Sequence, residues 1–348
     1  MVYFTSDYSA GAHPDVLKRL CDTNFEHTPG YGEDAYCAAA KEKIRKEAGC
    51  PDAEIEFLVG GTQTNAAVIS TVLRDFEGVI SADTGHINVH EAGAVEYTGH
   101  KVLTVPHKEG KITAEALSRF LDAYEAEPSR EHTVFPGMVY ISHPTELGTL
   151  YSKRELEELS AICRGRGMTL FLDGARICYG LMSGKSDMTL PDIARLCDVF
   201  TVGGTKAGAL FGEAVVFTRG NRPAHFMNSV KKRGAMLAKG RLIGLQFDTL
   251  FSGGLYWRIG KQADEKAMRM REVFSRHGIG FFIDSYTNQQ FVVLDAGVAA
   301  ELGKSIAFEI WGKLDDSRVA VRFVTGWTAC DGDIDELDRA LTEAVPGV

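Results

Sequence analysis

The sequence predicts an α/β fold, with a largely parallel sheet of seven strands in a large domain and a smaller α+β domain after it. Between about residues 50 and 217, short β-branched runs alternate with longer amphipathic segments. The runs are almost continuously apolar, which is typical of parallel strands with helices on both faces. At 348 residues, the chain is also long enough for about two domains.

Seven apolar runs are the expected strands of the large sheet. They are EIEFLV (54–59), GVISAD (78–83), KVLTVP (101–106), GMVYISHP (137–144), TLFLDGA (169–175), DVFTVGG (198–204) and EAVVF (213–217). Between them, Thr113–Tyr124 and Lys153–Arg166 carry apolar residues at i, i+3, i+4 and i+7, which predicts helices.

The pattern changes after residue 220, in a region that leads into a smaller domain. The expected elements are long helices at Asn221–Gln246 and Leu255–His277, strands at 290–295 and 318–325, and a closing helix at Asp333–Ala344. We therefore expect an N-terminal arm (1–17) that leads into the first helix, a large cofactor-binding domain (18–248) and a small C-terminal domain (249–348).

The composition excludes several classes of protein. Lys and Arg number 38 against 47 Asp and Glu, and this net charge of −9 argues against binding to nucleic acid. No apolar stretch approaches the ~18 residues of a membrane span, and the start MVYFTSDYSAG does not resemble a signal peptide. Seven scattered cysteines without a C-x-x-C pair indicate reduced thiols, so we expect a cytoplasmic protein without a disulfide framework.

Ligands of open α/β sheets bind beyond the carboxyl ends of the strands, which directs attention to the residues that end each run. Gly60, Gly61 and Thr62 follow the first run and precede a helix. Glycines let a backbone approach an anion, and first-turn N–H groups can hold a phosphate. The same turn is also compatible with a purely structural helix cap.

Asp173 and Lys206 end two further runs, and each has a functional and a structural interpretation. Asp173 is either an N-cap or a carboxylate that holds a proton on a cofactor ring nitrogen. Lys206, after DVFTVGGT, is either a solvated turn residue or an amine that forms a Schiff base. Arg176 offers a planar fork to a carboxylate, or pairs with an acid of its own domain.

Together these sites predict a pyridoxal 5'-phosphate enzyme. The phosphate of this cofactor needs a helix N-terminus, its ring nitrogen needs an acid, and its aldehyde needs an amine. The turn at Gly61, the carboxylate of Asp173 and the amine of Lys206 supply one of each.

The chain also resembles the low-specificity L-threonine aldolases of the β-eliminating lyase group, from SDYSAG to VRFVT and above all in FLDGAR and GGTKAGALFGEAVVF. The resemblance implies the type I aspartate aminotransferase fold. It implies that Lys206 forms the Schiff base, that Asp173 faces the ring nitrogen and that His86 stacks on the ring.

The resemblance implies further contacts to the cofactor and to an amino acid substrate. The phosphate contacts are Gly61, Thr62, Thr205 and, from a neighbouring subunit, Arg241. The substrate contacts are Ser6, Arg176 and Arg322, which grip the carboxylate, and Tyr31 nearby. A site shared between subunits implies a homo-oligomer, a dimer at least, and we expect a tetramer.

One segment departs from the family pattern. The better-known aldolases carry a histidine in an E-N-T-H-N-G-like segment, whereas S-H-P-T-E-L-G (142–148) places Glu146 there. Glu146, His86, His143 or a water therefore remain candidate bases for the substrate hydroxyl. His86 and His90 are spaced i, i+4, but without an evident third ligand we expect no metal site.

The expected reaction is retro-aldol cleavage of a β-hydroxy-α-amino acid, of the L-threonine or L-allo-threonine type, to glycine and an aldehyde. Two alternatives share the same Lys, Asp and Arg: β-elimination, and an aldolase for aromatic β-hydroxy amino acids. A more distant alternative is a metabolite-binding α/β protein without covalent catalysis, which leaves Lys206 unexplained.

Overall fold

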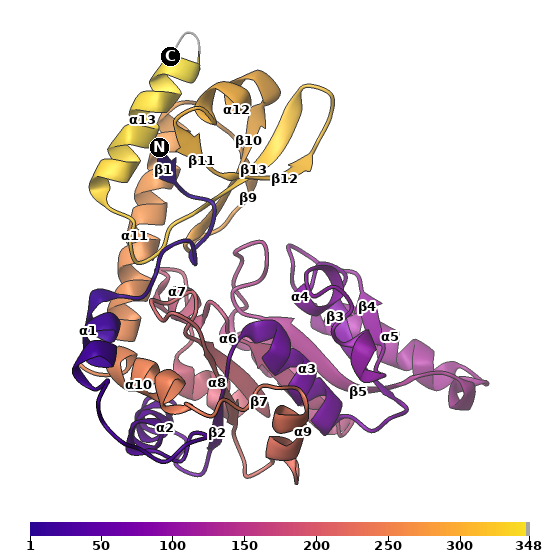
Figure 1. The fold of residues 1–348 in the computed structure, drawn as a ribbon. Coiled ribbons are helices and arrows are strands. Elements are labelled where there is room, and N and C mark those ends of the chain that lie inside the picture. Colours follow the sequence, from indigo (N-terminus) through magenta and orange to yellow (C-terminus); the bar gives the residue numbers. More distant parts are fainter. Residues whose placement is uncertain (346–348) are drawn as a thin grey trace.

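The computed structural model describes residues 1–345 of the chain. Within them, a seven-stranded sheet forms the centre of the large lower part of the molecule in Figure 1, and a four-stranded sheet lies in the smaller upper part. The large sheet has the strand order β2-β8-β7-β6-β5-β3-β4. Its strands are β2 (Glu54–Leu58), β3 (Glu77–Ala82), β4 (Val102–Val105), β5 (Phe135–Ser142), β6 (Thr169–Asp173), β7 (Val199–Gly203) and β8 (Glu213–Phe217).

The strand directions confirm the predicted, largely parallel sheet. Strands β4, β3, β5, β6 and β7 pair in parallel, and each predicted apolar run coincides with one strand of the sheet. Strand β8 is antiparallel to both of its neighbours, β2 and β7. The first residues of β8 therefore lie at the edge where β6 and β7 end.

Helices cover both faces of the large sheet, as its apolar strands require. One face packs on α3 (Gly61–Val72) and α9 (Phe226–Lys232). The other face packs on a larger group: α2 (Ala35–Glu47), α5 (Ala114–Ala126), α6 (Lys153–Gly165), α7 (Ile177–Met182), α8 (Leu190–Leu196) and α10 (Arg241–Leu250). The remaining short elements are α1 (Pro14–Asp22), α4 (His86–Val89), η1 (Glu96–Thr98) and η2 (Arg130–His132).

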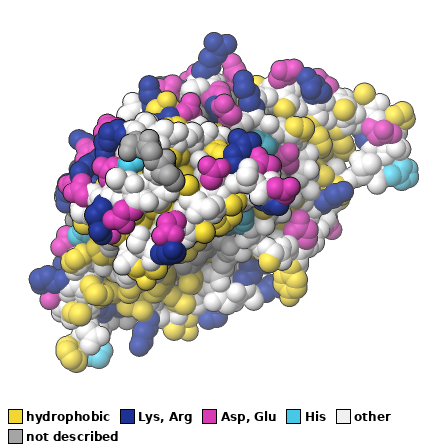
Figure 2. Space-filling model, turned by 90° about the horizontal axis from the view of Figure 1, so that it is seen from above, with side chains coloured by type: hydrophobic (Ala, Val, Ile, Leu, Met, Phe, Trp, Pro, Cys, Tyr) yellow, Lys and Arg dark blue, Asp and Glu magenta, His cyan; other side chains and the backbone are white. Residues whose placement is uncertain are grey.

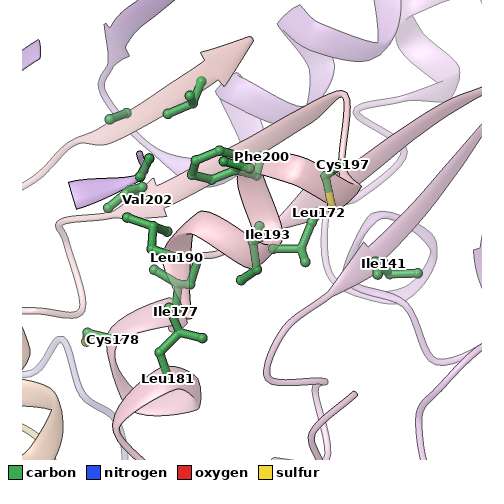
Figure 3. Packing of buried hydrophobic residues seen from close by; sticks show 14 of the residues in the cluster. Ile141, Leu172, Ile177, Cys178, Leu181, Leu190, Ile193, Cys197, Phe200 and Val202 are labelled. Carbon is green, nitrogen blue, oxygen red and sulfur yellow. The ribbon is translucent and has the colours of Figure 1, made fainter. Parts of the chain in front are cut away.

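The core beneath β6 and β7 is densely filled. Figure 3 shows Leu172 and Phe200 of these strands among Ile177 of α7 and Ile193 of α8, and all four side chains are fully buried. Each such burial contributes roughly 1.5–3 kcal/mol. This packing fixes the strands whose ends carry Asp173 and the loop to Lys206.

A separate core holds the small upper part together. Its sheet has the order β12-β13-β10-β9, and it packs against helices in a cluster that includes Phe274, Phe323 and Leu337. The elements are α11 (Leu255–Arg276), β9 (Phe281–Ile283), β10 (Gln289–Asp295), α12 (Ala296–Leu302), β11 (Ile306–Ala307), β12 (Glu309–Lys313), β13 (Arg318–Val324) and α13 (Asp331–Ala344). Helix α11 contacts both α7 and α13, so it joins the two parts.

The start of the chain belongs with this small part rather than only leading into the first helix. Strand β1 (Val2–Tyr3) pairs in parallel with β11, and Phe4 lies in the small core. The first helix begins at Pro14, four residues before the expected position, with His13 as its N-cap.

The prediction of one long helix at Asn221–Gln246 is wrong. The structure has two helices there, α9 and α10, separated by a loop. Gly234 follows α9 with φ of 69°, a left-handed conformation that suits glycine and ends a helix. Strands β9 and β12 were not expected, because both are short and only partly buried.

The surface is chemically mixed. On the face shown in Figure 2, Lys and Arg side chains are interspersed with Asp and Glu. Within residues 1–345, no helix combines the length and the apolar character needed to cross a membrane. All seven cysteines are free thiols, and four of them are buried.

Candidate active site

A cavity of about 410 Å³ opens where β5, β6 and β7 end and β8 begins. This volume lies within the range of small-molecule sites. Ten of the residues singled out from the sequence line it: Gly60, Gly61, Thr62, His86, His90, Glu146, Asp173, Arg176, Thr205 and Lys206.

Lys206 reaches this cavity from a loop that glycines allow to pass close to its neighbours. A Cβ atom on Gly203 would lie 2.3 Å from the carbonyl oxygen of Ala175. Tyr256 Oη donates to the Gly203 carbonyl at 2.8 Å, and Tyr179 Oη donates to the Lys206 carbonyl at 2.5 Å. The loop is therefore held by its backbone, which leaves the Lys206 side chain to the cavity.

Burial and the nearby Arg176 guanidinium lower the pKa of the Lys206 amine below its ordinary value. A lysine with a lowered pKa is more often neutral, and therefore nucleophilic, near neutral pH. This is the property that condensation with an aldehyde requires.

Asp173 is held ionised by three hydrogen bonds. Its Oδ2 accepts from Tyr140 Oη at 2.7 Å and from Asn65 Nδ2 at 2.9 Å, and its Oδ1 accepts from the Ala175 amide at 2.9 Å. Burial opposes ionisation, but nearby His86 and these hydrogen bonds together lower the pKa of Asp173 below its ordinary value. A buried carboxylate of this kind can hold a proton on a facing ring nitrogen.

The His86 imidazole is connected to Asp173 through two residues. His86 Nδ1 lies 2.8 Å from Oε1 of the buried Glu91, and Asn65 Nδ2 donates to the same oxygen at 2.8 Å. Burial alone would lower the pKa of His86, but Glu91 and the charge of Asp173 raise it above its ordinary value. Asn65 thus bridges two carboxylates, which fixes the His86 ring relative to Asp173.

Sequence reasoning missed Asn65, Glu91 and Tyr140. Asn65 and Tyr140 lie inside a helix and a strand, and Glu91 lies just after α4. The one feature of the sequence that could have pointed to these residues was their polarity within buried segments. Polarity alone does not predict which hydrogen-bond partner each side chain has in the fold.

Glu146 lies beside His86 in the cavity. Its Oε1 accepts from Ser142 Oγ at 2.6 Å and from the His86 amide at 2.9 Å. Burial raises the pKa of Glu146 above its ordinary value, against the hydrogen bond from Ser142. By contrast, His143 is 1% exposed and does not line the cavity, and burial lowers its pKa to about 4.

Arg176 is paired with a carboxylate of the N-terminal arm. Its Nε donates to Asp7 Oδ2 at 2.7 Å and its Nη2 to Asp7 Oδ1 at 3.1 Å. Asn288 Nδ2 donates to the same carboxylate at 2.9 Å. The guanidinium is therefore positioned at the cavity wall by the arm and by the small part of the molecule.

Four residues expected at the site do not line this cavity. Ser6 lines a neighbouring hollow, where its Oγ lies 2.8 Å from Ser9 Oγ. Arg322 donates to Glu309, and Arg241 donates to Thr23 Oγ1 at 2.7 Å. Tyr31 is half exposed and lies under Lys231.

The residues present fit pyridoxal phosphate. The N-cap of α3, Gly60, makes no side-chain cap, and a Cβ added at Gly60 or Gly61 would meet only open space. The first turn of α3 therefore opens into the cavity as an anion site. Asp173 and Lys206 supply the acid and the amine at the same cavity.

This fold and site define a pyridoxal-phosphate-dependent enzyme with the aminotransferase fold. The comparison with Thermus thermophilus aspartate aminotransferase shows the fold alone, with a TM-score of 0.70 at 14% identity over 99% of this chain and 91% of that one. The β-eliminating lyase family matches residues 4–297, and the chain belongs to that family. The protein is therefore a pyridoxal-phosphate-dependent lyase.

Two threonine aldolases are similar to this chain. A low-specificity L-threonine aldolase of Pseudomonas sp. is 30% identical over 273 residues, which cover 76% of this chain and 75% of that protein. The threonine aldolase of Leishmania major has a TM-score of 0.96 at 38% identity, over 99% of this chain and 100% of that one.

Proposed function

We propose that this protein cleaves a β-hydroxy-α-amino acid of the L-threonine or L-allo-threonine type to glycine and an aldehyde. The observation that carries the proposal is the position of Glu146, a half-buried carboxyl in the same cavity as Lys206 and Asp173. The relatives named above act as threonine aldolases, which supports this substrate class.

Pyridoxal phosphate supplies an aldehyde that condenses with amines and a ring that accepts the electrons released at Cα. Lys206 provides the amine that holds it, and Asp173 holds a proton on its ring nitrogen. Gly61, Thr62 and Thr205 bind the phosphate. In this proposal His86 covers the ring, held by Glu91.

The substrate groups are assigned from the cavity and from the family resemblance. Arg176, which lines the cavity, binds the substrate carboxylate, and the resemblance adds Arg322 and Ser6 as further contacts to it. Glu146 accepts the proton of the β-hydroxyl, so that the Cα–Cβ bond breaks and the aldehyde leaves. The pKa of Glu146 is raised above its ordinary value, so its carboxylate is a stronger base than that of an ordinary glutamate, which suits this proton transfer.

The products test this reaction. Purified protein is incubated with L-threonine, L-allo-threonine or L-phenylserine, and glycine, aldehyde, ammonia and oxo acid are measured. Glycine with an equal amount of aldehyde supports aldol cleavage, and the best substrate distinguishes the aliphatic from the aromatic type. Ammonia with an oxo acid would instead identify a β-eliminating enzyme.

We also propose that the protein is a cytoplasmic homo-oligomer, at least a dimer and by its resemblance a tetramer. The seven free thiols support a reducing compartment. Arg241 and Tyr31 lie outside the cavity of their own chain, as expected of residues that serve a neighbouring subunit. Sedimentation velocity of wild type and Arg241→Ala, with the cofactor affinity of each, tests this arrangement.

A further inference from the structure

Glu213 is a buried acid that the proposed reaction does not use. It is 3% exposed, and its Oε2 has no hydrogen-bond partner within residues 1–345. It nevertheless lines the cavity that holds Lys206. A lone buried carboxyl costs several kcal/mol if it ionises without a partner, so its presence in a core strand needs a reason.

The sheet explains how Glu213 reaches the site. It is the first residue of β8, and it pairs with Gly203 of β7 on one side and Leu58 of β2 on the other. Because β8 runs against β7, its first residue lies at the edge where the Lys206 loop begins. Val215 and Phe217, which alternate with Glu213 on the same face, pack in the core beneath α3.

The charged groups around this position have other partners. Asp7 is bound to Arg176, and Asp173 accepts its three hydrogen bonds from neutral donors and lies near His86. Glu213 alone among these acids combines a buried, unpartnered oxygen with a position on the cavity wall. Burial, with a smaller contribution from the charge of Asp173, raises the pKa of Glu213 to about 8, against the charge of Lys206 and the nearby Thr205 side chain.

We propose that Glu213 is a positioning residue that controls the protonation of the Lys206 nitrogen. This inference rests on the proposed role of Lys206. At low pH Glu213 is a neutral acid, and as pH rises it becomes a carboxylate that stabilises a positive charge on that nitrogen. Perturbed acids of this kind are typical of functional sites.

The test is a spectroscopic pH titration of the holoenzyme. The visible absorption of cofactor bound to Lys206 is followed for wild type and Glu213→Gln, and the midpoint of the nitrogen's titration is compared. Gln has nearly the same shape but no charge, so its midpoint should fall by about one pH unit. A midpoint equal to that of wild type would overturn the proposal.

Two further variants keep the result decisive. Asp264 is a buried carboxyl with both oxygens unpartnered, but it lies on α11 and does not line the cavity, so Asp264→Asn should leave the midpoint unchanged. An equal shift in Asp264→Asn would assign the effect to the general loss of a buried carboxyl and overturn the proposal. If Glu213→Gln fails to fold, Glu213→Asp replaces it in the test. The aspartate carboxyl lies one methylene farther from the Lys206 nitrogen, so the midpoint should still fall. An unchanged midpoint would contradict the proposed role of Glu213.

Reduction with borohydride separates this inference from the proposed function. If borohydride fixes the cofactor of the wild-type protein to the peptide that contains Lys206, the role of Lys206 holds. The titration midpoints then test the role of Glu213 alone. If reduction attaches the cofactor elsewhere or nowhere, both the role of Lys206 and that of Glu213 are wrong.

Discussion

Asp173 and Lys206 follow neighbouring strands of one sheet, whereas Arg176 and Arg322 depend on contacts between distant parts of the chain. The first pair, the cofactor half of the site, rests on the packed core of β6 and β7. The second pair, which we propose binds the substrate carboxylate and call the carboxylate half, is paired with internal acids: Arg176 with Asp7 and Arg322 with Glu309.

This difference has a physical meaning. Strand ends in a filled core are fixed before any ligand arrives, so the cofactor half is preorganised. The carboxylate half depends on the N-terminal arm and on β12, whose residues are partly exposed. Mutations in the two halves should therefore differ in size and in the quantity that they change.

The largest expected effect is in the cofactor half. Lys206→Ala removes the amine that holds the cofactor, so product formation should fall by about 10³-fold or more, equivalent to at least ~4 kcal/mol of barrier. Glycine release measured at saturating substrate checks this. Activity within tenfold of wild type would show that another amine serves the cofactor.

Glu146→Gln should lower kcat by about 10²-fold, because an amide cannot accept the hydroxyl proton. The raised pKa of Glu146 also predicts that kcat/KM of wild type falls as pH decreases through that pKa, above the ordinary range of a glutamate. In Glu146→Gln this fall of kcat/KM at low pH should be absent. An unchanged kcat would transfer the role to His86 or to a water.

Asp7→Asn tests the carboxylate half through stability. It leaves the buried guanidinium of Arg176 without its charge partner, which costs about 3–5 kcal/mol when a buried pair is broken. Urea unfolding of the holoenzyme measures this loss. Glu336→Gln, which breaks a surface pair with Arg339, is the control and should leave stability nearly unchanged, because solvent screens an exposed pair.

The same variant has a predicted pH dependence. Despite burial, Arg176 and Lys206 lower the pKa of Asp7 below its ordinary value. The stability that this carboxylate contributes is therefore present above its unfolded pKa and is lost as pH falls through the folded one. Wild type should lose stability over this acidic window, and Asp7→Asn should lose less.

The smallest expected effect is on KM, when the partner of Arg322 in the carboxylate half is changed. Glu309→Gln removes the acid that binds Arg322, so a substrate carboxylate no longer competes with it. KM should fall by up to about fivefold with kcat unchanged, since a partly exposed pair contributes up to ~1 kcal/mol. A rise in KM would mean that Glu309 positions Arg322 for the substrate.

The cofactor half could be predicted from the sequence because its residues are adjacent to strand ends. Apolar runs located the seven strands, and topology then brought Gly61, Asp173 and Lys206 to one edge. The supporting residues could not be predicted in this way. Asn65 bridges Asp173 and Glu91 because α3 lies over β6. The local sequence does not show how close a residue of α3 comes to a residue of β6.

The sequence by itself predicted the parallel sheet, the cofactor and the acid and amine that we propose hold it, because hydrophobic periodicity and strand-end chemistry are local properties. The tertiary structure alone decided that the N-terminal arm pairs with the small part, that Asp7 meets Arg176 and that Glu213 lies unpartnered at the cavity. These contacts join residues that lie far apart in the chain, such as Val2 and Ile306, which are 304 positions apart. Their free energy comes from burial and charge pairing that exist only once the chain has folded.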